Sequence, residues 1–191
     1  MVITEYIRYN NDRNIDSLFG LFGSIERNPF GLSKDEKREI IRLILSDFSN
    51  IKEWWTEELS TAGMKIIKLL GKDVDGSEAI YSEKGMNTLM KVGGLLDKDY
   101  VVDTPTSREA LRCITNCILL REFTKQYLKQ QDVIIFCVHL LNAPNLSLDS
   151  RFLKCRILYF MTIGRPDLVE RLIQLDVISA LENVNPKEQL Y

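Results

Sequence analysis

The sequence lacks the motifs on which most enzymes depend. It has a single histidine, His139, and contains no Walker-type phosphate loop, no G-x-G-x-x-G, no G-x-S-x-G and no carboxylates at metal-binding spacing. His139 lies on an apolar run with only Cys137 nearby, which favours a packed histidine over a catalytic one. We therefore expect no covalent chemistry, no metal and no cofactor, and a protein that acts through a binding surface. An enzyme built on His139 and a nearby thiol is the remote alternative.

Cysteine pairs are also missing. The four cysteines lie inside apolar helical patterns, at Cys113, Cys117, Cys137 and Cys155. None forms a C-x-x-C pair, and no histidine or second pair completes a zinc set for Cys113 and Cys117. The pattern predicts buried free thiols in a reducing cytosol.

Strong charge and membrane segments are absent as well. The formal net charge is -2, which gives no electrostatic reason to propose nucleic acid or an anionic membrane as a partner. The first 12 residues are polar and carry no secretory or mitochondrial signal. The longest uncharged run, residues 133–148, is too short to span a bilayer. We expect a cytoplasmic protein with no nucleic-acid partner, no membrane insertion and no small-molecule substrate.

What the chain does have is helical periodicity, with no strand alternation of useful length. The predicted helices cover residues 14–26, 33–48, 51–70, 83–91, 106–120, 122–141 as two helices that meet near 131–132, 151–163 and 166–175. Residues 73–82, 97–105 and 142–148 are predicted connectors. Trp54 and Trp55 would point about 100 degrees apart in a helix, so at most one can be central to the core. The sequence predicts an all-α protein.

Several helix ends carry capping signals. Ser33 with Glu36, and Thr106 with Glu109, each fit a capping box that starts a helix. Gly71 suits the end of the 51–70 helix, and Gly93 with Gly94 is expected to close the 83–91 helix.

The stretch from 106 to 165 organises the chain. Its helices at 107–120 and 151–163 are apolar around most of their circumference, so neither fits the surface of a globular protein. Each is expected to be sandwiched between neighbours in a stacked helical array.

A weak internal repeat runs through these helices. Lys68, Arg112 and Lys154 each interrupt a strongly apolar helix, at offsets of 44 and 42 residues, which is the spacing of armadillo and HEAT repeats. A cation inside an apolar helix must reach solvent or meet an anion. With Lys72 and Arg156 these residues could form a cationic ladder in a groove, or they could simply reach solvent. Periodicity leaves both interpretations open.

Four ordered segments resemble the synembryn family, the armadillo-like exchange factors and folding chaperones of heterotrimeric G-protein α subunits. Residues 66–73 resemble the family's L-R-I-L-S-R-D segment, and residues 84–95 resemble E-G-M-x-x-L-L-R-L-A-G-L. Residues 109–116, E-A-L-R-C-I-T-N, resemble E-A-L-K-C-L-C-N, and residues 156–162 resemble L-R-L-L-F-L-L-T.

The resemblance implies an armadillo/HEAT-like, right-handed superhelical solenoid whose concave groove takes the C-terminal helix of a Gα subunit. The family's groove residues correspond to Lys68, Lys72 and Asn116. Lys68 and Lys72 are four apart, so one helical face could present both to a carboxylate. The predicted partner-binding residues are Lys68, Lys72, Arg112, Asn116, Lys154 and Arg156.

The resemblance also implies the function. We expect a guanine nucleotide exchange factor and chaperone that promotes GDP release or stabilises the nucleotide-free α subunit, without bond chemistry. Lysines stand where the family has arginines, which removes bidentate geometry and should weaken the grip on a carboxylate. We expect one armadillo-like domain over residues 1–191, complete or as the N-terminal part of a longer solenoid. Exchange is expected only where the family's C-terminal half is present. The alternative is an armadillo-like adaptor that binds another helical or extended peptide.

Overall fold

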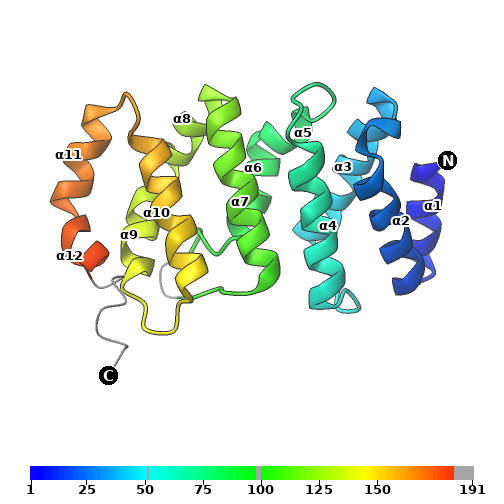
Figure 1. The fold of residues 1–191 in the computed structure, drawn as a ribbon, viewed down its shortest axis with the longest axis horizontal. Coiled ribbons are helices and arrows are strands. Elements are labelled where there is room, and N and C mark those ends of the chain that lie inside the picture. The colour runs from blue at the N-terminus through cyan, green and yellow to red at the C-terminus, as the bar shows by residue number, and fades with distance from the viewer. Residues whose placement is uncertain (51, 98–99, 183–191) are drawn as a thin grey trace.

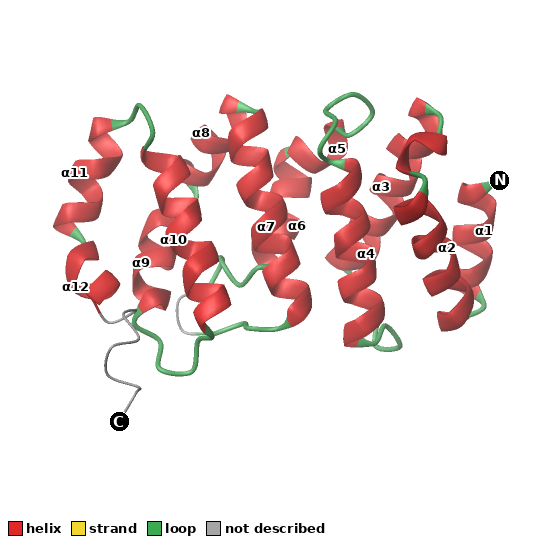
Figure 2. Cartoon of the chain, viewed as in Figure 1, coloured by secondary structure: helices red, strands yellow, loops and turns green. Residues whose placement is uncertain are grey.

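The structure, a computed structural model, describes residues 1–50, 52–97 and 100–182. All regular structure in these ranges is helical, and they contain no strand (Figure 2). The elements are α1 (Val2–Asn11), α2 (Ile15–Arg27), η1 (Pro29–Gly31), α3 (Lys34–Ser49), α4 (Glu57–Leu70), α5 (Glu78–Tyr81), α6 (Glu83–Val92), α7 (Pro105–Leu120), α8 (Glu122–Gln130), α9 (Val133–Leu141), α10 (Leu148–Thr162), α11 (Pro166–Gln174) and α12 (Val177–Glu182). The all-α prediction is confirmed.

The helices form an elongated array with α1 and α12 toward opposite ends (Figure 1). In the front layer α2, α4, α7 and α10 follow one another, and each packs against the next. Helices α3, α6, α8 and α9 lie behind them. Helix α7 packs against α4, α6, α8 and α10, and α10 packs against α7, α9 and α11. The two apolar helices are therefore sandwiched between neighbours, as predicted.

Several predicted helix boundaries are confirmed. Ser33 and Glu36 form a complete capping box at the start of α3, and Gly71 caps the end of α4. Helix α6 ends at Val92 with Gly93 as its C-cap, and Gly94 follows with a φ of 68°. A side chain at Gly94 would also collide with Val102, because an added Cβ would lie 2.8 Å from the Val102 Cβ. The glycine pair therefore turns the chain away from α6.

The predicted capping box at the start of α7 is wrong. Thr104 is the N-cap, because Pro105 follows it at the first helical position, where the missing N–H costs nothing. The Thr104 hydroxyl accepts from the Ser107 amide at 3.1 Å, and the Ser107 hydroxyl accepts from the Thr104 amide at 2.9 Å. Thr106 is instead inside the helix, and its amide donates to the Glu57 carboxylate at 2.8 Å. Glu109 therefore takes no part in capping this helix.

The predicted start of the 51–70 helix is also wrong. Residue 51 lies outside the described residues, and helix α4 begins only at Glu57, with the Thr56 side chain as its cap. Trp54 and Trp55 precede the helix, in a turn where the Trp55 amide donates to the Lys52 carbonyl at 2.9 Å. Trp55 is buried and Trp54 half-buried, so one indole belongs to the core.

Three α-helices were not predicted: α1, α5 within the expected 73–82 loop, and α12 beyond residue 175. The short 3-10 helix η1 was not predicted either. Helix α1 escaped notice because half of its residues are polar. Two buried side chains anchor it to the Asp47 carboxylate of α3: the Tyr6 hydroxyl donates at 2.5 Å and the Asn10 amide at 2.9 Å. Burial and the neighbouring Asp47 charge raise the pKa of Tyr6 well above its usual range.

Asp103 joins the start of α10 to the start of α7. Its carboxylate accepts from the Ser147 amide at 2.5 Å, from the Ser150 hydroxyl at 2.5 Å and from the Arg108 guanidinium at 2.7 Å. Burial alone would raise the pKa of Asp103, but the hydrogen bonds from Ser150, Ser147 and Arg108 lower it to about 2. This carboxylate therefore stays ionised and fixes one end of α10 beside α7.

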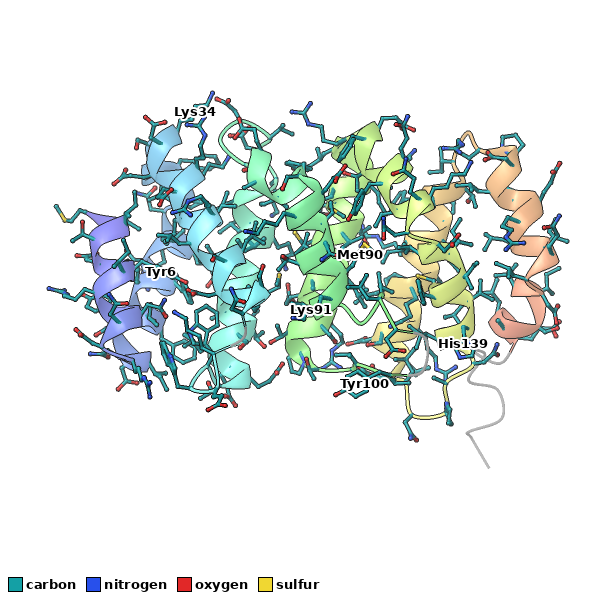
Figure 3. All side chains as sticks on the ribbon, turned by 180° about the vertical axis from the view of Figure 1, so that it is seen from behind. Tyr6, Lys34, Met90, Lys91, Tyr100 and His139 are labelled. Atoms are coloured by element: carbon teal, nitrogen blue, oxygen red, sulfur yellow. The ribbon has the colours of Figure 1, made fainter. Side chains whose placement is uncertain are left out.

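The cysteine prediction holds, whereas the histidine prediction is wrong. All four thiols are free; Cys113, Cys117 and Cys137 are buried and Cys155 is half-buried. His139 is exposed rather than packed, because it lies on the outward side of α9 (Figure 3). Among the helices of the described ranges, none combines the length and the apolar character that crossing a membrane requires.

Candidate partner-binding surface

Two of the predicted cations meet at one carboxylate. Helix α4 carries Lys68 in its last turn, and its ammonium forms an ion pair with Glu109 of the adjacent helix α7. Arg112, one turn further along α7, donates to the other oxygen of the same carboxylate at 2.9 Å. Glu109 is only 8% exposed. The first two rungs of the predicted ladder are therefore joined through a buried anion, and together the three groups carry one net positive charge.

A separate set of contacts fixes the register of α4 against α7. The Thr106 amide donates to the Glu57 carboxylate, and the Thr106 hydroxyl lies 2.9 Å from the Thr61 hydroxyl. These contacts join the start of α7 to the first turns of α4. Because both helices are rigid, this register also decides that Lys68 faces Glu109.

Asn116 lies on the same side of α7 as Arg112, since residues four apart share a helical face. It is half-buried. Its side-chain amide makes no hydrogen bond to any other residue that the structure describes. The amide therefore offers both a donor and an acceptor to a partner.

Lys72 lies beyond the end of α4, so the argument that it shares a helical face with Lys68 does not hold. It belongs instead to the loop after α4, where it is exposed. Lys37 of α3 holds this loop by donating to the main-chain oxygens of Asp73 at 2.8 Å and Asp75 at 2.6 Å. Lys72 is thus available to solvent and lies outside the cluster of Lys68, Glu109 and Arg112, which we call the paired cluster.

Lys154 is not on the surface at all. Its side chain lies in the interior, 1% exposed, within electrostatic reach of Cys137 and Asp103. In the described part of the chain it has neither a hydrogen-bond nor an ion-pair partner. Burial lowers the pKa of its ammonium. The predicted ladder therefore ends before α10, and Lys154 neither reaches solvent nor meets an anion.

Arg156 is exposed on α10, where its guanidinium lies over the Phe160 ring at 5.6 Å from the centroid. Lys154 and Arg156 are two positions apart, which places them on different sides of the helix. Arg156 instead shares its side with Phe152 and Tyr159, each 63% exposed.

These exposed rings are candidate site residues that the sequence analysis missed. It treated α10 as apolar on all sides and therefore buried. One helical face carries Phe152, Arg156 and Tyr159, which are spaced at i, i+4 and i+7. The sequence alone does not show that the neighbouring helices leave this face uncovered. At the end of α7, Leu119 and Leu120 are 53% and 41% exposed.

We call the outward side of the front layer the outer surface. It combines the paired cluster of α4 and α7, the amide of Asn116, and exposed apolar side chains of α7 and α10. Its members are Lys68, Glu109, Arg112, Asn116, Leu119, Leu120, Phe152, Arg156 and Tyr159. Such a surface can bind an amphipathic helix, because it offers apolar contact area beside cations and an unpaired amide.

The thiols offer little reactivity. Burial raises the pKa of Cys137 to about 12, and a hydrogen bond with Cys113 together with burial raises that of Cys117 well above its usual value. Both are protonated near neutral pH and so are poor nucleophiles. Within the described ranges, no three His, Cys, Asp or Glu side chains gather as metal ligands would.

Comparison with known proteins identifies one family. The family model described as guanine nucleotide exchange factor synembryn matches residues 64–187. The matched segment begins in α4 and contains all six residues predicted to bind a partner. A search of curated proteins finds no match.

Proposed function

Because the chain belongs to the synembryn family of guanine nucleotide exchange factors, we propose that its outer surface binds the C-terminal helix of a heterotrimeric G-protein α subunit. The observation that carries this proposal is the paired cluster of Lys68, Glu109 and Arg112 beside exposed apolar side chains. An amphipathic helix that ends in a free carboxylate needs cations near the carboxylate and apolar contacts along its apolar side. We propose no nucleic-acid partner and no substrate that is chemically altered.

Each end of such a helix would meet a different part of the outer surface. The terminal carboxylate would approach Lys68 and Arg112, whose charges exceed that of Glu109 by one. Asn116 would hydrogen-bond main-chain groups near the end of the helix. The apolar side of the helix would pack against residues such as Phe152 and Tyr159. Burial of these exposed rings would favour binding.

We also propose that the array is an armadillo-like, right-handed solenoid and that the outer surface lies on its concave side. The succession of α4, α7 and α10 supports this arrangement, because corresponding basic residues recur at offsets of 44 and 42 along the chain. The groove would then run across the front layer.

Exchange would follow from differential binding. A surface that holds the C-terminal helix in a displaced position stabilises the α-subunit conformation with an open nucleotide site, and so favours GDP release. The same preference would protect a nucleotide-free subunit while it folds. The chain itself would act without forming or breaking a bond.

The first experiment measures binding of a Gα C-terminal peptide by fluorescence polarisation, with a free carboxylate and with an amidated end. We expect amidation to weaken binding about tenfold or more, because it removes the charge that Lys68 and Arg112 would meet. Lys68→Ala should lose this carboxylate preference. Lys84→Ala, at an exposed lysine of α6, is the matched control and should keep it.

The second experiment uses the whole α subunit and measures complex formation and GDP release. A complex is expected, and faster GDP release is expected where the family's C-terminal half is also present. Finding neither would refute the proposal. A complex that an excess of the C-terminal peptide fails to displace would favour the alternative, an adaptor for some other helix or extended peptide.

A further inference from the structure

A separate cavity of about 470 Å³ lies where α3, α4 and α6 meet the residues that lead into α7. Its buried walls include the rings of Phe48 and Trp55, which contact each other edge to face with centroids 5.4 Å apart. The outer side is lined by Leu96, Tyr100 and Val102. The volume falls in the range of small-molecule sites, about 300–1,000 Å³. We call this cavity the connector pocket.

Apolar side chains continue from the buried rings to the mouth of the connector pocket. Val92 is a buried lining residue, and Leu96 and Tyr100 line the pocket with 38% and 68% of their surfaces exposed. In Figure 3, Tyr100 lies at the lower edge of the molecule, below Lys91. An exposed aromatic ring beside a cavity with two more rings provides apolar contact area for a bound molecule.

The carboxylates around the pocket already have partners. Asp47 forms an ion pair with Lys52 at 2.9 Å, in addition to its contacts with α1. Glu57 accepts a hydrogen bond from the Thr106 amide at 2.8 Å. Asp97 also interacts with another group of the chain. Among the described residues that line the pocket, no carboxylate is therefore without a partner.

The cation and the two threonine hydroxyls of the lining are engaged as well. The Lys91 ammonium donates to the Ser49 carbonyl at 3.3 Å. The Thr104 hydroxyl accepts from the Ser107 amide, and the Thr106 hydroxyl lies 2.9 Å from that of Thr61. These groups stabilise the start of α7 and its contact with α4.

Ser60 differs from these polar residues. It lines the pocket from α4, where it is half-buried. Its hydroxyl makes no hydrogen bond to any residue that the structure describes. The indole N–H of Trp55, by contrast, donates to the Asn10 side chain at 3.4 Å. The Ser60 hydroxyl can therefore donate to a ligand or accept from it.

An apolar wall with one unpaired hydroxyl and no unpaired charge favours a neutral ligand. An ion that entered the pocket would lose its hydration without gaining an unpaired counter-ion, which is costly. A neutral apolar body would instead remove ring surface from water. One polar group on that body could form a hydrogen bond with Ser60.

We propose that the connector pocket binds a small neutral molecule in which an aromatic body carries one hydroxyl or carbonyl group. Its body packs between the ring of Tyr100 and the buried rings, and its polar group forms a hydrogen bond with the Ser60 hydroxyl. This site is separate from the outer surface and does not depend on the function proposed for it.

The test is an NMR titration of the ¹⁵N-labelled chain with two neutral compounds, benzyl alcohol and toluene, and two ions, benzylammonium and benzoate. We expect both neutral compounds to shift the amide signals of Val92, Gly94 and Thr106, which line the pocket. Each ion should bind about fivefold or more weakly than the alcohol, because it would leave water without gaining an unpaired counter-ion.

A substitution at Ser60 tests the hydrogen bond. Ser60→Ala should weaken binding of benzyl alcohol about three- to tenfold, the contribution of one hydrogen bond. The affinity for toluene should not change, because toluene has no group that could meet the hydroxyl. The matched control is Ser46→Ala, at a half-buried serine of α3 outside the pocket, and it should change neither affinity.

A substitution at the mouth tests the location. Tyr100→Ala removes an exposed ring, so the chain should stay folded, and both neutral compounds should bind more weakly. Tyr159→Ala removes a similarly exposed ring of α10 and should leave both affinities unchanged.

Three results would overturn the proposal. Shifts confined to other parts of the chain, or no shifts at millimolar concentration, would show that the pocket is not a site. An ion that binds as tightly as benzyl alcohol would contradict selection for a neutral molecule. In Ser60→Ala, an unchanged affinity for the alcohol, or equal losses for the alcohol and toluene, would exclude the hydrogen bond to Ser60.

Discussion

The ammonium of Lys68 on α4 forms an ion pair with the carboxylate of Glu109 on α7. The two residues are 41 positions apart in sequence, and Glu109 is almost completely shielded from water. Because Arg112 shares the same carboxylate, Glu109 joins two adjacent helices of the front layer and at the same time holds two cations toward the outer surface.

Removing the charge of Glu109 should destabilise the fold. We expect Glu109→Gln to lower the free energy of unfolding by about 1–3 kcal/mol, since two partly buried cations lose their common anion. Urea denaturation followed by circular dichroism measures the change. Glu122→Gln, which removes an exposed carboxylate 3.8 Å from the Lys125 ammonium, should stay within about 0.5 kcal/mol of the unmodified chain. Equal stability of the two variants would contradict a structural role for Glu109.

Asn116 should matter for binding but not for stability, because its amide has no partner within the described structure. Asn116→Ala should weaken binding of the Gα C-terminal peptide by about 0.5–1.5 kcal/mol, the contribution of one hydrogen bond. Calorimetric titration measures the affinity, and thermal unfolding should be unchanged. Asn87→Ala on the exposed side of α6 serves as control. A loss of stability without a loss of affinity would argue against the proposed contact.

Phe152 and Leu153 are neighbours in sequence with opposite surroundings: Phe152 is 63% exposed and Leu153 is 2% exposed. Phe152→Ser should leave the unfolding free energy within about 0.5 kcal/mol of the unmodified chain while weakening peptide binding. Leu153→Ala should cost about 2–5 kcal/mol through the cavity that it leaves. Chemical denaturation and polarisation measurements on both variants separate the two roles. If Phe152→Ser bound the peptide normally, α10 would not belong to the binding surface.

Lys154 should weaken the fold, because it is a buried cation without a partner. Lys154→Met keeps the volume and removes the charge, and should stabilise the chain by about 1–3 kcal/mol near neutral pH. In the unmodified chain the folded-state pKa of Lys154 lies below that of the unfolded chain, so the unfolded state binds more protons between the two values. Stability should therefore rise with pH across that window.

Unfolding free energies measured at a series of pH values separate the effect of the Lys154 charge from a change in packing. In Lys154→Met the rise in stability between the two pKa values should disappear, and in Lys65→Met, at an exposed lysine of α4, it should persist. Destabilisation by Lys154→Met would instead show that the ammonium has a favourable partner.

Asp103 should make stability sensitive to acid. Its pKa is held at about 2, so the unfolded state takes up a proton first as the pH falls. The stabilisation is complete above the ordinary aspartate pKa of 3.8 and is lost as the pH falls towards 2. Asp103→Asn should cost about 1.5–3 kcal/mol at neutral pH, because hydrogen bonds to a charged acceptor are replaced by weaker ones.

Urea unfolding between pH 2 and neutrality would measure both effects. The matched control is Asp149→Asn, at an exposed position in the first turn of α10. Its stability should depend on acid pH in the same way as that of the unmodified chain. An unchanged acid profile in Asp103→Asn would mean that the link between α7 and α10 contributes little.

Local sequence rules succeeded where a helix carries its own signals. The stop at Gly93 and Gly94 and the capping box of Ser33 and Glu36 depend only on residues within one turn, and both are present in the structure. The rules failed where a distant group decides. Helix α1 depends on the contact between Tyr6 and Asp47, and no pattern within residues 2–11 reveals that contact. At the start of α7 the error was local, because Pro105 made Thr104 a better cap than Thr106.

The sequence by itself determined that the chain is helical, that α7 and α10 are inner members of a stacked array, and which family the chain resembles. These properties follow from the spacing of apolar residues and from short motifs, and both can be read from residues that are near one another in sequence. Only the tertiary structure decided what each cation does. Lys68, Arg112 and Lys154 look equivalent in sequence, yet two share Glu109 and the third is buried without a partner. The reason is physical: the surroundings of a charged side chain are set by the helices packed beside it, and those come from distant parts of the chain.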